Sequence, residues 1–510
     1  MLFFFTCTPH TLKNFAEFST FFILLFIFKK IKKIKKKTFY VITKVLPGSM
    51  IASTKAAEVL WRVGKRQIRN ISSTNTTTPT FSAMFVEPAL SRTVLAHTST
   101  YNLALSSFVF NVCNQRKIID PVIRFLRASE SQTSGLTKRA VTLLTRHTVF
   151  PHFTAGESMD SLHRVSSLME ESKVKLLVDH SVEEREREED WDENVSNKVQ
   201  LLRNCKATMA SQVGFVPVKA TAMVSPTLLE IMTSIILEES KLGEHHYADK
   251  EICPRNKMIS HDLELLESAL KNLSIVCQEA QALQLPILLD AEQSHRQPAI
   301  DYLCRRLQRE FNVKSPIIYN TYQMYMTCSG RRVERDLKDS VRHGYKLAAK
   351  VVRGAYLVSE KERSDANNTI YPLWEDKACT DVSYDDSVET LVRSVADGSG
   401  ASLLIATHNL SSVQKAIVVM QECGVEKGSA QVAFAQIMGM CDVLTLALGA
   451  YGCNTHKLVL YGDFDDLFPW LLRRLDENRD MLGAAQLELP IIQGELKRRV
   501  FSVLRGIQQH

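Results

Sequence analysis

Eight short apolar runs, each followed by a longer segment with helical spacing, constrain the fold of this chain most. The runs are VKLLVD (174–179), VGFVPVK (213–219), LPILLD (285–290), PIIYNTYQ (316–323), AKVVRGAY (349–356), SLLIATHN (402–409), QVAFAQI (431–437) and HKLVLYG (456–462). Each run is continuously apolar rather than alternating, which is typical of parallel strands buried on both faces. We therefore expect eight parallel strands.

The segments between the runs have the spacing of amphipathic helices. In 262–284 apolar residues recur at helical intervals, and Ser260 is placed to cap that helix. The segment 412–424 ends in a glycine, as helices often do. Strands alternating with helices predict an α/β fold of the (β/α)8 or TIM-barrel type. An open doubly wound sheet is the alternative, but no G-x-G-x-x-G sequence follows any run.

The chain before the barrel divides into three predicted parts. Residues 1–49 form an atypical leader: its apolar run (18–28) is shorter than the roughly 20 residues that span a bilayer, and a lysine-rich run follows it. A secretory signal has its positive charges before the apolar run, and here they come after it. Because transit-like text begins at Met50, our hypothesis is that Met50 is the working start and that 1–49 is not translated. Residues 50–85 are rich in Arg, Ser and Thr and poor in acids, as in a mitochondrial transit peptide; a disordered basic tail is the alternative.

The remainder is predicted to be a helical N-terminal region over 86–165 and the barrel over 166–510. Two stretches interrupt the barrel pattern, the acidic run EEREREEDWDE (183–193) and the polar stretch 238–260. Blocks of like charge repel and stay extended, so we interpret both as solvated insertions.

Composition excludes several classes of function. The net charge is +7, but much of the excess lies in the first seventy residues, and no basic stripe with interleaved aromatics indicates nucleic-acid binding. The 11 cysteines are scattered without a C-x-x-C pair, which argues against a disulfide framework or zinc ribbon and fits a reducing compartment.

Polar and charged side chains gather where the predicted strands end. In chain order they are Lys219, Asp290, Gln323, Arg353-Gly354-Ala355-Tyr356 and Thr407-His408-Asn409; the helix-like PWLLRRLDENR (469–479) after the eighth run adds Arg473, Arg474 and Glu477. In a barrel these strand ends meet at one rim, where active sites lie. So many cations in one place need an anion to neutralise them.

Each member of this set alone has a plain explanation. Lys219 resembles many exposed lysines, His408 a structural histidine, and Asp290 a helix cap. Arg473 and Glu477 have the spacing of a surface ion pair worth a few tenths of a kcal/mol. Their shared position at one end of successive strands favours a joint site.

The absence of several motifs limits the kinds of reaction that this chain can catalyse. The sequence contains no H-E-x-x-H metal motif, no G-x-S-x-G elbow and no P-loop. A basic rim without a nucleophile favours an organic cofactor with phosphates and a small acidic substrate.

The motifs taken together resemble the proline dehydrogenase (proline oxidase) family of the mitochondrial eukaryotic type. They are LLDAEQSHRQPAIDYL (288–303), VVRGAYLVSE (351–360), ATHN (406–409), FAQIMGMCD (434–442) and PWLLRRLDEN (469–478), and the similarity runs from HFTAGES (152–158) to the C-terminus. The ordered series is far more specific than any one motif.

This resemblance implies a distorted (β/α)8 barrel that holds noncovalent FAD. It implies oxidation of L-proline to Δ1-pyrroline-5-carboxylate, the first step of proline catabolism, with electrons passed to a membrane quinone. It also implies peripheral association with the matrix side of the inner mitochondrial membrane, which agrees with the transit-like segment.

The resemblance further implies roles for individual residues. Arg473 and Arg474 would grip the substrate carboxylate with planar, fork-shaped donors, and Glu477 would hold those forks. Lys219 would add a third contact to the carboxylate, and Asp290 would support the basic cluster. Residues expected to line the substrate pocket or to act in catalysis also include Tyr356, Leu458 and Trp470. Those expected to contact FAD are Gln323, Lys350, Arg353, Gly354, Ala355, Thr407, His408, Asn409 and Gly439, with Lys350 beside the flavin ring.

Three positions depart from the family pattern. Leu458 and Trp470 stand where the family usually has tyrosine, and Ala435 stands where it usually has glycine. A leucine in place of a phenol changes the room and polarity around the substrate ring, which makes 4-hydroxy-L-proline the alternative substrate. Because Leu458 offers no hydrogen bond to a hydroxyl, we keep proline as the predicted substrate.

Two other hypotheses follow from the same residues. One is a different TIM-barrel enzyme that binds a phosphorylated substrate at the basic rim, which predicts a colourless protein. The other is an inactive family member that acts as a binding protein, which predicts retained FAD that proline does not bleach.

Overall fold

The computed structural model describes residues 92–113, 145–180, 188–240, 252–369, 371–480 and 482–507, with a few further positions between 81 and 143. For 113, 188–189, 475–480, 482–487 and 503–507 it describes only the helical backbone. The predicted leader (1–49) and nearly all of the transit-like segment (50–85) lie outside these residues.

The chain forms two compact units. One comprises Met1–Thr78 and Gln132–His147, within which the described residues 142–143 and 145–147 are helical. The other comprises Pro79–Ser131 and Thr148–His510 and contains all the strands of the described residues. No helix in the described ranges has both the length and the apolar character needed to cross a membrane.

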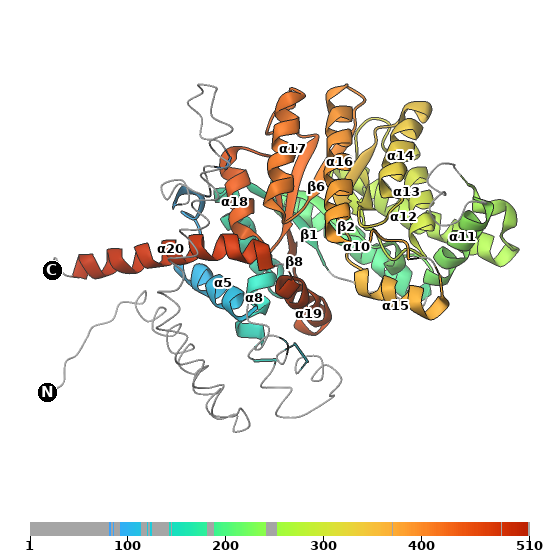
Figure 1. Ribbon diagram of the computed structural model, residues 1–510. Helices are drawn as coiled ribbons and strands as arrows, with labels where there is room; N and C mark the ends of the chain where they lie inside the picture. The colour runs from blue at the N-terminus through green and yellow to red at the C-terminus, as the bar shows by residue number, and fades with distance from the viewer. Residues whose placement is uncertain are drawn as a thin grey trace. The chain divides into compact units, whose positions relative to one another are not determined.

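The larger unit is built around a closed barrel of eight parallel strands (Figure 1). The strands are β1 (Val174–Asp179), β2 (Val213–Val218), β3 (Ile287–Leu289), β4 (Ile318–Gln323), β5 (Ala348–Val352), β6 (Ser402–Ala406), β7 (Val432–Ile437) and β8 (Thr455–Leu460). Each pairs with the next in sequence, and β8 closes the barrel on β1 with Leu177 opposite Leu458. The predicted TIM-type barrel is confirmed.

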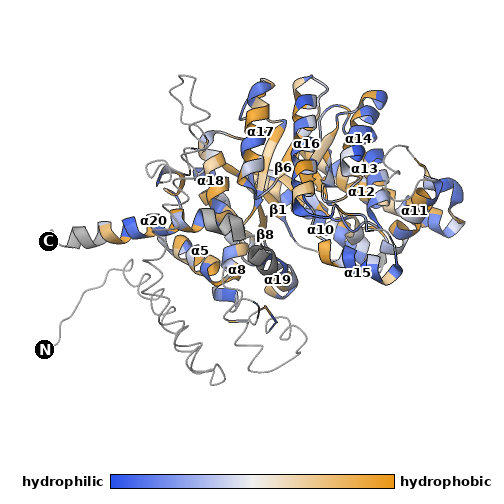
Figure 2. Cartoon of the chain, in the orientation of Figure 1, coloured by the Kyte–Doolittle hydropathy of each residue, from blue (hydrophilic) through white to orange (hydrophobic). Residues whose placement is uncertain are grey.

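Helices follow the strands around the outside of the barrel. They are α10 (Glu188–Met209), η1 (Ala220–Ala222), α11 (Pro226–Glu239), η2 (Pro254–Lys257), α12 (Ser260–Leu283), α13 (Gln297–Phe311), α14 (Ser329–His343), α15 (Leu357–Asn367), α16 (Lys377–Ala396), α17 (Leu410–Glu422), α18 (Asp442–Tyr451), α19 (Phe464–Asp480) and α20 (Leu482–Ile507). Figure 2 shows that hydrophobic residues gather on the strands and hydrophilic residues on the outer helices, since the ribbon is orange along β6 and largely blue on α14.

The region before β1 contributes α5 (Thr100–Cys113), α8 (Phe150–Phe153) and α9 (Met159–Glu171). Helix α5 packs against α20, where the Arg499 guanidinium donates to the carbonyls of Thr98 at 2.8 Å and Leu95 at 2.9 Å. The chain after α8 runs beside β8, because the Ala155 amide donates to the Leu460 carbonyl at 2.8 Å. The last contact brings the segment after α8 to the carboxyl end of β8.

Two layers of apolar side chains make up the core. The barrel interior is filled by Leu177, Phe215, Leu288, Tyr319, Ala348, Leu404, Ala433 and Ala435, with the partly buried Ala406 and Leu458 packed against them. The other strand side chains point outward and pack under the helices. This filled interior closes the barrel centre, so the site lies at its rim.

Three local expectations differ from the structure. Ser260 is the first residue of α12 and does not cap it; Ile259 occupies the cap position without a side-chain bond. The predicted fifth and sixth runs extend beyond the strands, which end at Val352 and Ala406. The acidic run 183–193 is not wholly an extended insertion, because α10 begins at Glu188 and Trp191 is buried.

Candidate active site at the carboxyl rim of the barrel

Lys219 directly follows β2 and stands at the start of η1. It lines a small cavity together with Asp290, Asp179 and Lys198. The Lys198 ammonium is held by the Asp179 carboxylate at 3.2 Å and by the Pro217 carbonyl at 2.9 Å. Within the described residues, Lys219 has no such hydrogen bond or ion pair, so its ammonium is available to an anion in the rim.

Asp290 and Lys350 form an ion pair across the barrel mouth. The Lys350 ammonium lies 2.5 Å from the Asp290 carboxylate, and the two side chains are 15% and 26% exposed. Partial exposure keeps this pair in contact with solvent at the rim. Asp290 thus orients the lysine expected beside the flavin.

Tyr356 lies among charges from the loop after β3 and from α19. Burial raises the pKa of its hydroxyl most, the negative charges of Glu292 and Asp290 raise it further, and Arg473 opposes them. The phenol therefore remains neutral at physiological pH. Asp290 and Arg473 of α19 thus act on the pKa of the same phenol in opposite directions.

Glu292 is a member of this group that the sequence analysis missed. Its carboxylate accepts from both the amide and the hydroxyl of Thr221, each at 3.1 Å. Burial raises its pKa, while those bonds and the charge of Lys219 lower it. The signal was present in the sequence, because Glu292 follows Asp290 by two residues in DAEQ.

Arg353 joins the loop after β5 to the loop after β6. Its guanidinium donates to Asp381 at 2.6 Å, to the Thr407 hydroxyl at 2.7 Å and to the Ser412 hydroxyl at 2.9 Å. It also lies over the Tyr384 ring, 4.3 Å from its centre. With its donors engaged in this way, Arg353 fixes the position of Thr407.

Gly354 and Ala355 form the exposed turn of the RGAY segment. Gly354 has φ +140°, and a Cβ there would lie 2.5 Å from the Tyr325 ring, so the turn requires glycine. The Ala355 amide donates to the side-chain oxygen of Gln323 at 3.3 Å, and the Gln323 amide donates to the Glu292 carbonyl at 2.7 Å. Gln323 therefore connects the loops after β3 and β5.

His408 is a neutral histidine. Burial lowers its pKa to about 3, and the positive charges of Lys457 and Arg474 lower it further. Its Nε2 accepts from the Ile437 amide at 3.0 Å, so the ring proton is on Nδ1. The next residue, Asn409, caps α17 by accepting from the Ser411 amide at 2.9 Å.

An ion pair behind His408, between a buried lysine and a partly exposed aspartate, was also missed. The Lys457 ammonium, on β8, lies 2.5 Å from the Asp442 carboxylate at the start of α18. The Asp442 carboxylate also accepts from the Gly439 amide at 3.2 Å. Gly439 has φ +78° and its carbonyl accepts from His152, so residues of β8, α18 and α8 fix this turn.

Helix α19 carries the double arginine over the rim. Glu157 accepts from the Phe464 amide at 3.1 Å and so holds the first turn of the helix. Arg474 is buried with its guanidinium 5.1 Å from the centre of the Trp470 ring, whereas Arg473 is exposed. The side chain of Glu477 lies outside the described residues, and its predicted role stays a prediction.

The rim thus holds two connected groups of the predicted residues. One comprises Lys219, Asp290, Lys350, Tyr356 and Arg473; the other comprises Arg353, Thr407, His408 and Arg474, linked by hydrogen bonds and charge interactions. Leu458 lies below them at the top of the barrel interior. This arrangement can bind a small carboxylate and orient an anionic cofactor.

Comparisons with known proteins identify the family. The family model described as proline dehydrogenase matches residues 161–486. Proline dehydrogenase 2, mitochondrial, from Arabidopsis thaliana is 30% identical over 399 residues, covering 74% of this chain and 83% of that protein. Hydroxyproline dehydrogenase from Xenopus laevis is 27% identical over 426 residues, covering 79% of this chain and 88% of that protein.

Solved structures support the fold. Proline utilization A from Bdellovibrio bacteriovorus matches with a TM-score of 0.60 at 16% identity, over 83% of this chain. The protein from Bradyrhizobium japonicum with the same name matches with a TM-score of 0.55 at 15% identity, over 84% of this chain. This chain spans 41% and 47% of the length of those chains. With more than half of its residues matched by the family model, the chain belongs to the proline dehydrogenase family.

Proposed function

We propose that this protein is a mitochondrial, FAD-dependent enzyme that oxidises L-proline to Δ1-pyrroline-5-carboxylate and passes the electrons to a membrane quinone. The observation that carries the proposal is the match of the proline dehydrogenase family model to residues 161–486. The rim supports it, because Lys219 and Asp290 line one cavity and the charges of Asp290 and Arg473 both act on the pKa of Tyr356. Mitochondrial placement is supported by the transit-like segment 50–85 and by relatives named mitochondrial. Peripheral membrane association on the matrix side is part of the same proposal.

The residues of the rim fit FAD by their chemistry. Lys350 and Arg353 supply positive charge from one strand and its loop, which suits a cofactor that bears a diphosphate and becomes more negative on reduction. The exposed backbone at Gly354 and Ala355 allows close approach to a flat ring system. FAD, when bound, would supply the hydride acceptor.

The side chains of the chain itself would bind and orient the substrate. Arg473 and Arg474 would hold its carboxylate with fork-shaped donors, and Lys219 would add a third contact. Tyr356, neutral because of its raised pKa, would line the pocket as a hydrogen-bonding wall. No side chain needs to act as a base if proline enters with its amine neutral, so alignment and charge neutralisation dominate.

A second candidate is the oxidation of 4-hydroxy-L-proline. It is favoured by Leu458, which removes the family's usual phenol at the top of the barrel interior, and by relatives named hydroxyproline dehydrogenase. An apolar pocket rejects an added hydroxyl by only about 100-fold. Leu458 nevertheless has no group to bond that hydroxyl, so proline remains the proposed substrate.

The test is an anaerobic titration of the purified protein with L-proline and, separately, trans-4-hydroxy-L-proline, followed by flavin absorbance. We expect L-proline to bleach the flavin at the lower concentration. Bleaching mainly by hydroxyproline would replace the first candidate with the second. A protein without flavin would contradict the proposed cofactor, and flavin that neither compound bleaches would contradict the proposed activity.

A further inference from the structure

A ring of hydrogen bonds, which we call the Glu292 circuit, lies beneath the rim between β3, β4 and the helices that follow them. Its members are all buried: Glu292, Gln297, Asp301, Ser329, Arg332 and Gln323. It begins at the Glu292 amide, which donates to the side-chain oxygen of Gln297 at 2.8 Å. The Gln297 side-chain amide in turn donates to the Asp301 carboxylate at 3.0 Å.

The circuit returns to Glu292 through α14 and β4. Arg332 donates to the Asp301 carboxylate at 2.5 Å and, over a longer contact of 3.4 Å, to the Ser329 hydroxyl. The Ser329 hydroxyl donates to the Gln323 carbonyl at 2.6 Å. The Gln323 side-chain amide then donates to the Glu292 carbonyl at 2.7 Å, which closes the ring.

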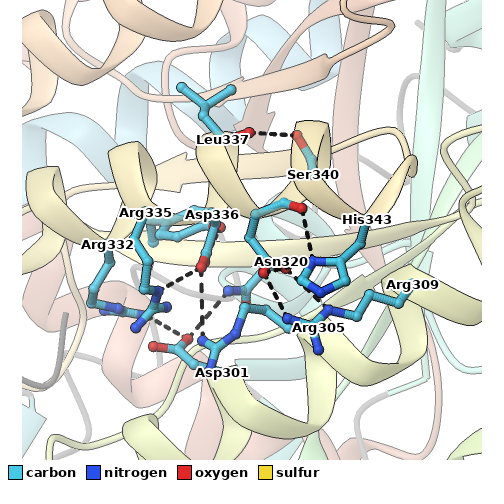
Figure 3. Close-up of polar contacts among 12 residues, drawn as sticks. Asp301, Arg305, Arg309, Asn320, Arg332, Arg335, Asp336, Leu337, Ser340 and His343 are labelled. Carbon is cyan, nitrogen blue, oxygen red and sulfur yellow. Dashed lines mark hydrogen bonds and ion pairs between the residues drawn. The ribbon is translucent and has the colours of Figure 1, made fainter. Parts of the chain in front are cut away.

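Figure 3 shows the charged part of this circuit. Asp301 extends from α13 toward Arg332 of α14, and Asn320 of β4 donates to the same carboxylate at 3.2 Å. Both Asp301 and Arg332 are fully buried, and the Arg332 guanidinium lies over the Tyr322 ring. Three elements thus meet at one carboxylate.

A buried ion pair is a weak source of stability, because its desolvation cost offsets its attraction. The effect of this one is better understood from what the circuit holds at the rim. The Glu292 carboxylate binds the amide and hydroxyl of Thr221, two residues after Lys219. Gln323 accepts from the amide of Ala355, the residue before Tyr356.

We propose that Asp301, Ser329 and Arg332 are positioning residues that fix the loops 219–222 and 353–356 through Glu292 and Gln323. The circuit thereby sets the spacing between Lys219 and Tyr356 across the pocket. Its effect on substrate rests on the proposed function, whereas its effect on the two loops does not. The two effects can therefore be tested separately.

The test compares Ser329→Ala with Ser340→Ala in the full-length protein. Ser329→Ala opens the circuit without removing a charge. Ser340 is a matched control, because it is also buried on the same helix and donates to the Leu337 carbonyl at 2.8 Å outside the circuit (Figure 3). Hydrogen exchange at the Thr221 and Ala355 amides reports the two loops directly.

We expect Ser329→Ala to speed exchange at both amides by about tenfold, the effect of losing one hydrogen bond, and Ser340→Ala to leave them unchanged. The KM for L-proline should rise by about tenfold in Ser329→Ala only. Equal exchange in the two variants, whether unchanged or faster in both, would overturn the inference. If the wild-type protein does not oxidise proline, the proposed function fails. The exchange rates of the two amides then still decide whether the circuit positions the loops.

Discussion

At the scale of single residues, two neighbouring arginines occupy different environments. Arg474 is buried against the Trp470 ring, while Arg473 is exposed near Tyr356. A change at Arg474 removes packing as well as charge. A change at Arg473 tests the proposed carboxylate contact with less effect on folding.

Arg473→Lys should lower kcat/KM for L-proline by about 10- to 100-fold, mainly through a higher KM. The physical reason is the loss of a planar fork that bonds a carboxylate at two points, since hydrogen bonds to charged groups contribute about 1.5–3 kcal/mol. Steady-state kinetics measure the effect, and thermal unfolding should show a midpoint close to that of the wild type.

Arg393→Lys is the matched control, because Arg393 is exposed on α16 and pairs with Glu389 within its own helix. That variant should keep the wild-type KM. A wild-type KM in Arg473→Lys as well would show that Arg473 does not bind the substrate.

At the scale of elements, the loop from β5 to α15 depends on one turn. Gly354 brings the Ala355 amide to Gln323, and its φ of +140° and contact with Tyr325 leave no room for a side chain. Such a backbone conformation costs about 1–3 kcal/mol in a residue with a Cβ.

Gly354→Ala should therefore displace the RGAY turn and lower kcat/KM by at least about tenfold. Gly398→Ala serves as the control, because Gly398 also has a positive φ of +79° but no atom within 4 Å of an added Cβ. Both variants should lose thermal stability through strain, and only Gly354→Ala should lose activity. Comparable kinetics in the two would mean that the turn does not position the pocket.

The same loop shows where sequence patterns stop being informative. All eight strands were predictable, because parallel strands buried on both faces must be apolar without interruption. The fifth apolar run continues to Tyr356, but the strand ends at Val352, since the turn at Gly354 depends on contact with Tyr325 from another strand's loop. The acidic run misled for a related reason: α10 buries Trp191 within it, and only tertiary packing reveals that face.

The candidate site was predictable to the same extent. Residues at strand ends could be named because topology alone brings them to one rim. Their partners could not, because contacts such as Asp442 with Lys457 or Arg353 with Asp381 join separate elements through packing. Glu488 is a further case, since it reaches from α20 to the first turn of α18.

At the scale of the whole molecule, buried titratable groups act in opposite directions on stability. Burial lowers the pKa of His408 and His456 to about 3 and lowers that of His152, so these rings stay neutral in the folded state. Unfolding lets them bind protons below about pH 6.5. Stability is therefore lost as the pH falls through that range.

Two buried carboxyls have the reverse effect. Burial raises the pKa of Glu488 from 4.5 to about 8 and also raises that of Glu292. In the folded state Glu488 keeps its proton up to about pH 8, but the unfolded chain releases it above 4.5. Its contribution to stability is therefore full below pH 4.5 and is lost as the pH rises toward 8.

Together, the contributions of the buried histidines and carboxyls predict that the free energy of unfolding is greatest near about pH 6.5. Below that value His408 and His456, each with a pKa of about 3, outweigh Glu488, and above it only the carboxyl terms remain, so stability falls on both sides. On the alkaline side Glu488 contributes a slope of about 1.4 kcal/mol per pH unit. Chemical unfolding at a series of pH values between about 5 and 8 measures the profile.

Glu488→Gln isolates the carboxyl term. The Leu444 amide donates to Glu488 at 3.1 Å, and a glutamine oxygen can accept the same bond, so the α18 cap is retained. The variant should lose about one proton's share of the alkaline slope. Its acid side should become steeper between about pH 5 and 6.5, because the Glu488 term no longer offsets the histidines there. Glu389→Gln, on the exposed face of α16, should leave both sides unchanged. If Glu488→Gln keeps the full alkaline slope, the proton taken up on folding does not reside on Glu488, and the joint between α20 and α18 is then held by an ionised carboxylate.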